Sequence, residues 1–289
     1  MLDRSDKVAP PANAAQQMAQ PLLQALRLAP STSDPFFGSH FDVADAVGDR
    51  LIVWLDPSRV GKQLQSRIEM PGSTLSVSDC CLGKGDWSKW LKPLEATLVD
   101  REVREVLASE PDYRAAPCYK RFFQEFVAKR PTVRNMIALD TPERVDAYFA
   151  DLVSLIASIR EKGVIRRPPR RLEQARALLP ALSAARPLAV ELTESEIGIA
   201  VGAAGELFRL GPGHHRMSIA RQIGLRRVPA ELRLFHVRWV REQMRLSKCG
   251  PLRAIRIGLA SLGVEPVRPV TEKPVVARPA TIQVPGETP

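Results

Sequence analysis

Cysteine is scarce in this chain of 289 residues, and its four cysteines match neither a zinc site nor a disulfide framework. Cys80 and Cys81 are adjacent, Cys118 and Cys249 stand alone, and no Cys-x-x-Cys pair occurs. We therefore expect reduced thiols, as in a cytosolic protein. No residue near Cys80 and Cys81 in the sequence would lower a thiol pKa, so we predict that these two side chains are unreactive.

Long apolar runs are also missing. No stretch approaches the roughly 18 apolar residues that a membrane-spanning helix needs. The first residues include an early acidic residue and no continuous apolar segment, so they do not have the pattern of a secretory signal. Hydrophobic residues make up 45% of the chain and charged residues 26%, as in globular proteins. We expect a cytoplasmic protein without a membrane partner.

Basic residues are in excess, with 42 Lys and Arg against 32 Asp and Glu and a formal net charge of +10. This balance favours acidic partners, such as nucleotides, other phosphate-bearing small molecules or nucleic acid. Arginine suits two-pronged contacts to phosphate better than lysine does. The most basic run, residues 166–171 (RRPPRR), has no interleaved aromatic residue for base stacking, so we interpret it as a solvated connector.

Composition and periodicity divide the chain into four segments. We expect a flexible arm at residues 1–35 with a short helix near its end, an N-terminal α/β portion at 36–139, a second domain at 140–262 and a disordered, proline-rich tail at 263–289. The first predicted strand lies in residues 49–60 and ends at Asp56-Pro57, because proline cannot continue a central strand. The other predicted strands are residues 197–201, 207–210 and 228–237, and the predicted helices are residues 118–130, 145–163, 172–186, 214–223 and one or two more between 240 and 264.

Histidine is rare, yet three of the four histidines lie close together in the sequence. His214 and His215 are adjacent, follow the glycines Gly211 and Gly213, and precede Arg216. A glycine-rich turn that leaves a strand and opens a helix favours an anion, because the first helical N–H groups are unpaired and the helix dipole is positive there. Arg216 can add a two-pronged contact to phosphate oxygens, and the histidines can donate hydrogen bonds or move a proton.

The residues around this turn exclude several other sites. A Rossmann fingerprint needs a third glycine where Arg216 stands, and the Gly-Lys-Ser/Thr of a Walker A loop is absent. Adjacent histidines such as His214 and His215 rarely bind one ion together, so we predict no metal site. The alternative for each residue alone is a basic helix start without a ligand. His236 lies a whole strand away, which favours a structural role.

Eight residues in and after the turn follow a specific order: Gly-x-His-Arg at a helix start, then alanine, a Gly-Leu turn and Val-Pro. They are Gly213, His215, Arg216, Ala220, Gly224, Leu225, Val228 and Pro229. With this pattern, residues 196–239 resemble the ParB/sulfiredoxin-like superfamily. The resemblance implies an α+β fold with a mixed sheet and helices at residues 140–262, to which the N-terminal α/β portion is an extension.

A looser similarity extends to an uncharacterised subgroup of ParB-like proteins. It rests on the loop Gly85-Asp86-Trp87 and on an aromatic helix before the histidine turn. Phe235 stands where that subgroup usually has arginine, so no role is carried over to this position. Trp87 has two open interpretations, a cap over a ligand pocket or a packing anchor.

In the superfamily the turn holds nucleotide phosphates. The resemblance implies that a nucleotide triphosphate, ATP or CTP with Mg²⁺, is bound by Gly211, Gly213, His214, His215 and Arg216. Members include DNA-partition CTPases, ATP-using sulfinic-acid reductases and a free-serine kinase. The reductases need a cysteine where His214 stands, so that chemistry is excluded. The residues after the last predicted strand leave too little room for the helix-turn-helix domain of the partition proteins.

A small-molecule phosphotransferase or a nucleotide hydrolase remains. A kinase needs a carboxylate to activate the acceptor hydroxyl, and Glu196 at the strand start is the nearest candidate, ahead of Glu194 and Glu191. His215 is the second candidate catalytic residue, because a histidine can move a proton near neutral pH. Two other hypotheses stay open: a non-catalytic nucleic-acid-binding or regulatory protein, and a scaffold whose pocket has lost its activity.

Overall fold

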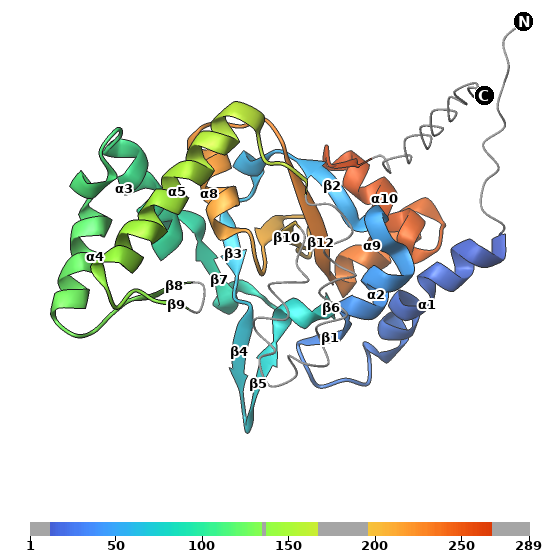
Figure 1. The fold of residues 1–289 in the computed structure, drawn as a ribbon. Helices are drawn as coiled ribbons and strands as arrows, with labels where there is room; N and C mark the ends of the chain where they lie inside the picture. Colours follow the sequence, from blue (N-terminus) through green and yellow to red (C-terminus); the bar gives the residue numbers. More distant parts are fainter. Residues whose placement is uncertain (1–11, 135–136, 167–195, 268–289) are drawn as a thin grey trace, which may run out of the picture.

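The computed structural model describes residues 12–134, 137–166 and 196–267 (Figure 1). Its fold is α+β, with helices packed around a mixed sheet, as the sequence predicts. The helices are α1 (Ala12–Leu28), α2 (His40–Val47), α3 (Leu98–Ala108), α4 (Pro117–Val127), α5 (Pro142–Lys162), α8 (His214–Gln222), α9 (Val237–Ser247) and α10 (Pro251–Ser261). The strands are β1 (Phe36–Ser39), β2 (Ile52–Leu55), β3 (Lys62–Leu64), β4 (Arg67–Met70), β5 (Ser73–Ser76), β6 (Cys80–Gly83), β7 (Leu91–Pro93), β8 (Val133–Arg134), β9 (Ile137–Ala138), β10 (Ile197–Val201), β11 (Leu207–Arg209), β12 (Val228–His236) and β13 (Glu265–Pro266).

Strand β12 lies at the centre of the main sheet. It pairs parallel with β10 on one side, and on the other side it pairs antiparallel with β2 and then parallel with β6. The order along the sheet is β1-β6-β12-β10-β11-β3-β7. Strands from residues 36–139 and from residues 196–236 therefore share one sheet. β12 is buried along almost its whole length, which agrees with its mainly apolar sequence.

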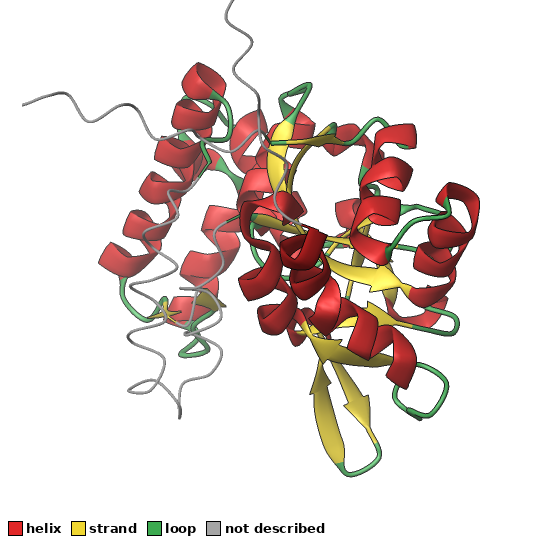
Figure 2. Ribbon diagram, turned by 90° about the vertical axis from the view of Figure 1, so that its right-hand side faces the viewer, coloured by secondary structure: helices red, strands yellow, loops and turns green. Residues whose placement is uncertain are grey.

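Successive residues of β10 contribute to two separate apolar cores. Ile197, Ile199 and Val201 belong to the larger core, whereas Ala200 belongs to the smaller one. Side chains alternate across a strand, so the continuous apolar run of β10 is typical of a strand that is buried on both faces. The larger core also includes side chains of α1, α2, α5, α8, α9 and α10. The smaller core includes side chains of the β4–β5 hairpin, which projects from the fold in both views (Figures 1 and 2).

Helices α3, α4 and α5 form a group at one end of the molecule, and α3 and α5 both contact α8 (Figure 1). Phe149 on α5 is fully buried in this group, with ring centroids of Tyr119 and Phe122 5.3 and 5.4 Å away. α5 begins at a Thr141 cap and ends at Gly163, whose φ of 71° favours glycine. The predicted glycine stop of this helix is thereby confirmed.

One expectation needs correction. The short helix expected within the flexible arm at residues 1–35 is α1, which covers residues 12–28 and belongs to the fold, because its apolar face buries Leu22 and Ala25 in the larger core. The predicted helix at residues 118–130 is present as α4. Its last residue, Val127, is 64% exposed.

The other predicted strands and helices that lie in the described residues are confirmed. β2 ends just before Asp56-Pro57, as expected from the proline, and two helices, α9 and α10, fill the region after β12. The predicted helix at residues 172–186, the connector beyond Arg166, Glu191, Glu194 and the tail beyond residue 267 lie outside the described residues.

Replacing Phe149 by alanine should destabilise the protein strongly, because its ring is enclosed by other aromatic side chains. Removal of a buried phenylalanine costs about 3–5 kcal/mol. The matched control is Phe123→Ala on neighbouring α4, where the ring is 37% exposed and the loss should be about 1 kcal/mol. Urea unfolding of both variants measures the difference. Equal losses would contradict the packing of the helical group.

Candidate anion-binding site at the start of helix α8

The turn that opens α8 lies directly against the first residues of β10. Gly213 precedes the helix with a φ of 83°, and a Cβ atom added there would lie 3.0 Å from the backbone Cα of Ile197. The backbone N–H of Leu210 donates to the carbonyl of Gly198 at 2.8 Å. A residue with a side chain would be strained at Gly213 both by its φ and by this contact. The predicted glycine turn and helix start are confirmed.

A buried arginine, Arg209, forms a hydrogen bond to the backbone of the turn. Arg209, the last residue of β11, is 2% exposed; its guanidinium donates to the carbonyl of Gly211 and, at 2.8 Å, to Oε1 of Gln63 on β3. These bonds fix the Gly211 carbonyl and bring a positive charge close to the start of α8. Sequence reasoning did not identify Arg209, because its partner Gln63 is distant in the chain.

The structure brings two predicted site residues together. Nη1 of Arg216, in the first turn of α8, lies 3.6 Å from Oε2 of Glu196, next to the start of β10. Glu196 is 1% exposed, and the Arg216 side chain is 12% exposed. A buried carboxylate is costly unless a cation compensates it. The geometry therefore favours a role for Glu196 in positioning the Arg216 guanidinium.

His215 is the end of a chain of hydrogen bonds that leads to a buried carboxylate. Its Nε2 lies 3.0 Å from the hydroxyl oxygen of Tyr148 on α5, and that hydroxyl donates to Oε2 of Glu102 on α3 at 2.9 Å. Tyr148 has a single hydroxyl proton, so its oxygen accepts from Nε2–H of His215. Nδ1 is then the unprotonated, accepting nitrogen of the neutral ring.

Arg134 completes this chain. It donates from two nitrogens to the two carboxylate oxygens of Glu102, whose side chain is fully buried. Burial and the adjacent Glu102 raise the pKa of Tyr148, so its hydroxyl keeps its proton. Tyr148, Glu102 and Arg134 carry no sequence motif and come from three elements, which is why the sequence did not indicate them.

Both histidines of the turn are neutral at pH 7. Burial and, to a smaller extent, the charge of Arg209 lower the pKa of His214 to about 3, while a hydrogen bond to the Gly211 backbone acts in the opposite direction. Burial also lowers the pKa of His215, where Glu102 acts in the opposite direction and Arg134 adds to the decrease. The start of α8 therefore presents two neutral imidazoles next to positively charged guanidinium groups.

His236 and Trp87 contact a different part of the fold. Nε2 of His236 donates to the carbonyl of Gly85 at 3.0 Å, and its Nδ1 accepts the backbone N–H of Arg238 at 3.1 Å, which caps α9. The Trp87 ring is 4% exposed, with its centroid 5.0 Å from that of His236. Both contacts agree with structural roles, in which the Gly85–Trp87 loop packs on the end of β12.

The thiols have the environment predicted for unreactive side chains. Burial raises the pKa of Cys80 and of Cys81 to about 12, and a nearby negative charge, Asp79 in the case of Cys80, adds to the increase. Both thiols therefore stay protonated at neutral pH. Among the described residues, no group of three or more His, Cys, Asp or Glu side chains could hold a metal ion.

Comparison of this chain with known protein families, with curated proteins and with solved structures finds no match. The resemblance of residues 196–239 to the ParB/sulfiredoxin-like superfamily therefore stays a prediction. In the described part of the chain, every helix is too short or too polar to span a bilayer.

The free energy of unfolding should fall as the pH is lowered from 6.5 towards 4. The pKa of His214 is about 3 in the folded chain against an ordinary value of 6.5, so the unfolded state takes up the proton first and is favoured. The loss from this group reaches up to about 1.4 kcal/mol per pH unit. Urea unfolding at pH 7 and pH 5 measures it, with His214→Gln as the comparison. If the variant loses as much stability as the wild type over this range, the buried neutral state of His214 is wrong.

Proposed function

We propose that this chain binds a phosphate-bearing small molecule, with a nucleotide as the first candidate, at the start of α8. One observation carries the proposal: the Gly211–Gly213 turn is fixed against β10 and opens a helix that has no acidic residue in its first turn and no side-chain cap. The first N–H groups of a helix have no partner within it, and the dipole is positive at that end. An anion is the ligand that satisfies both.

The charges around the turn support the same ligand. Arg209 lies beneath it, and Arg216 lies in the first helical turn, where a planar guanidinium can contact two phosphate oxygens. His214 and His215 are neutral and add no charge of their own; their N–H groups already bond the Gly211 backbone and the Tyr148 hydroxyl. The resemblance to the ParB/sulfiredoxin-like superfamily supports the proposal independently, because its members hold nucleotide phosphates at this turn.

Transfer of a phosphoryl group to a small hydroxyl acceptor is the reaction that we propose for the bound nucleotide. His215 would accept the proton of the attacking hydroxyl on Nδ1, while Tyr148 fixes the ring through Nε2. Glu196 would hold the Arg216 guanidinium towards the phosphates. When bound to the triphosphate, Mg²⁺ would neutralise part of its charge. Because Glu102 and Glu196 both face arginine side chains, we assign neither as a metal ligand.

Nucleotide binding should raise the melting temperature of the protein, since a ligand that binds only the folded state stabilises it by about 2.7 kcal/mol at 100 times its Kd. A panel of ATP, CTP, sugar phosphates and inorganic phosphate, with and without Mg²⁺, identifies the ligand. Arg216→Lys should reduce the shift, because lysine keeps the charge opposite Glu196 but loses the two-pronged contact. Arg226→Lys, at an exposed position after α8, is the matched control.

The panel also separates the proposal from its alternative. Absence of any shift in the wild type, or equal shifts in both variants, would contradict a phosphate site at α8. Binding of duplex DNA with a steep salt dependence and no response to nucleotides would instead favour the nucleic-acid-binding hypothesis.

If the bound nucleotide is consumed, His215→Gln should lower kcat by about 10²–10⁴-fold and leave nucleotide binding nearly unchanged, because the proton acceptor alone is lost. Tyr148→Phe should have a smaller effect of the same kind, since it only releases the ring. Glu196→Gln should instead weaken nucleotide binding, because Arg216 loses its ionic partner. Release of the nucleoside diphosphate measures turnover. A loss of kcat in Glu196→Gln without a change in binding would show that Glu196, rather than His215, activates the acceptor.

A further inference from the structure

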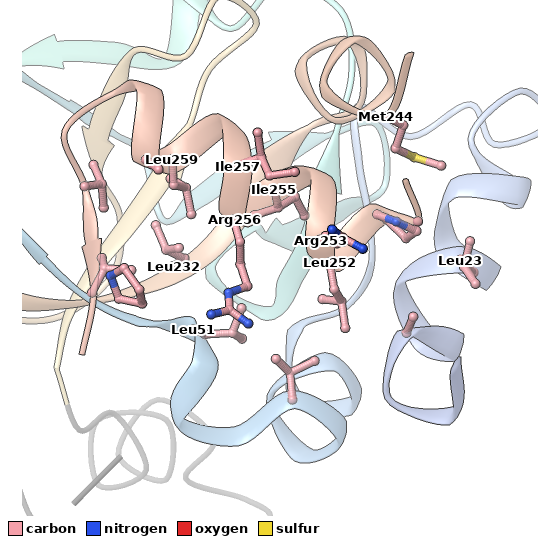
Figure 3. Close-up of a pocket in the computed structure, with 18 residues that line it drawn as sticks. Leu23, Leu51, Leu232, Met244, Leu252, Arg253, Ile255, Arg256, Ile257 and Leu259 are labelled. Atoms are coloured by element: carbon pink, nitrogen blue, oxygen red, sulfur yellow. The ribbon is translucent and has the colours of Figure 1, made fainter. Parts of the chain in front are cut away.

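A large cavity lies away from the α8 turn, between α1, the short helical turn at Gly48–Leu51, β2, β12 and α10 (Figure 3). Its volume is about 980 Å³, at the upper end of the range for small-molecule sites. None of its lining residues belongs to α8 or to the glycine turn before it.

The walls of this cavity are almost entirely apolar. Leu23 and Met244 form one end, and Leu51, Leu232, Ile255 and Leu259 form much of the rest (Figure 3). Such walls offer few hydrogen-bond partners, so a sugar or a nucleotide base would leave its polar groups unsatisfied inside. An alkyl chain has no such groups and gains from leaving water.

Two arginines are the only charged side chains among the described residues that line the cavity. Arg253 and Arg256 both come from α10, and no Asp or Glu is part of the lining. Within the described part of the chain, neither guanidinium has a hydrogen bond or an ion pair. In Figure 3 the side chain of Arg256 extends from α10 towards Leu51. Positive charge is thus placed at the edge of an apolar cavity whose described lining includes no acidic side chain.

The position of these arginines in α10 strengthens their preference for an anion. Arg253 lies in the first turn of the helix, where the dipole is positive and a cation is unfavourable. That first turn contains no acidic residue, and Gly250 provides no side-chain cap. Arg256 is three residues further along, so the two guanidinium groups lie on neighbouring positions of one helix face. A bound anion would offset the repulsion between the two guanidinium groups and the unfavourable interaction of Arg253 with the helix dipole.

We propose that this cavity binds a single-chain anionic amphiphile, with its alkyl chain between α1 and α10 and its head group on Arg253 and Arg256. The head group is a carboxylate or a phosphate, since either accepts hydrogen bonds from two guanidinium groups. The proposal rests on the cavity and its charge alone and does not depend on the α8 site.

Calorimetric titration of the full chain with decanoate and with decyl phosphate, each below its micelle concentration, tests the proposal and distinguishes the two head groups. Uncharged decanol is the matched ligand. The double variant Arg253→Gln/Arg256→Gln should bind the preferred anion on the order of tenfold more weakly or worse and bind decanol as the wild type does. Arg238→Gln, at an exposed arginine of α9 outside the cavity, should behave as the wild type. Ala19→Phe, which places a ring in the cavity from α1, should weaken binding of all three ligands.

Four results would overturn the proposal. The first is no heat of binding for either anion. The second is equal affinity for decanol and the anions with no effect of the double arginine variant, which would indicate an apolar partner. The third is binding to anionic vesicles but not to the monomeric amphiphiles, which would indicate a membrane surface. The fourth is a dimer in sedimentation experiments that Ala19→Phe dissociates, which would make a second copy of the chain the occupant.

Discussion

The contact between the Gly211–Gly213 turn and the start of β10 is the constraint on which the candidate site depends. Two backbones meet there without a side chain between them, at Gly213 against Ile197 and at Gly198 against Leu210. Because β10 also pairs with β12, this contact ties the start of α8 to the centre of the sheet. The helix cannot shift along the sheet without losing its apolar packing, so its N-terminal N–H groups have a fixed direction.

Two buried carboxylates near this fixed helix start each face an arginine: Glu102 binds Arg134, and Glu196 lies 3.6 Å from Arg216. On β12, Glu231 lies 3.6 Å from Arg233 in the same kind of pair. Such pairs are weak sources of net stability, since both charges lose their water. They do, however, fix the arginine side chains. If an arginine moved away, a buried carboxylate would lose its compensating cation, so each guanidinium has one preferred position. At the α8 turn, this orients a guanidinium and, through Tyr148, an imidazole before any ligand arrives.

Local features of the fold could be predicted from the sequence, and long-range ones could not. The turn, α8, β10 and β12 follow from glycine positions and apolar periodicity, which are properties of neighbouring residues. A short helix was expected within residues 1–35, but its packing was not, because the apolar face of α1 contacts α2, β1 and α10 and no local pattern indicates such contacts. In the site, Gly213 and Arg216 belong to a compact motif. Tyr148 acts on His215 from 67 residues away, and no periodicity indicates such a pair.

The arginines of this basic chain fall into two classes, those that face a carboxylate and those that do not. Arg134 and Arg233 face carboxylates within the fold, so their charges are largely compensated by the protein itself. Arg253 and Arg256 face an apolar cavity that has no acidic lining. Net charge alone cannot distinguish these classes, because each arginine counts equally in the sum. An anion gains most where protein carboxylates do not already compete for the cation. The acidic partner that a charge of +10 predicts therefore depends on a few arginines. By this criterion Arg253 and Arg256 of α10 are less compensated than Arg216 of α8, which lies opposite Glu196.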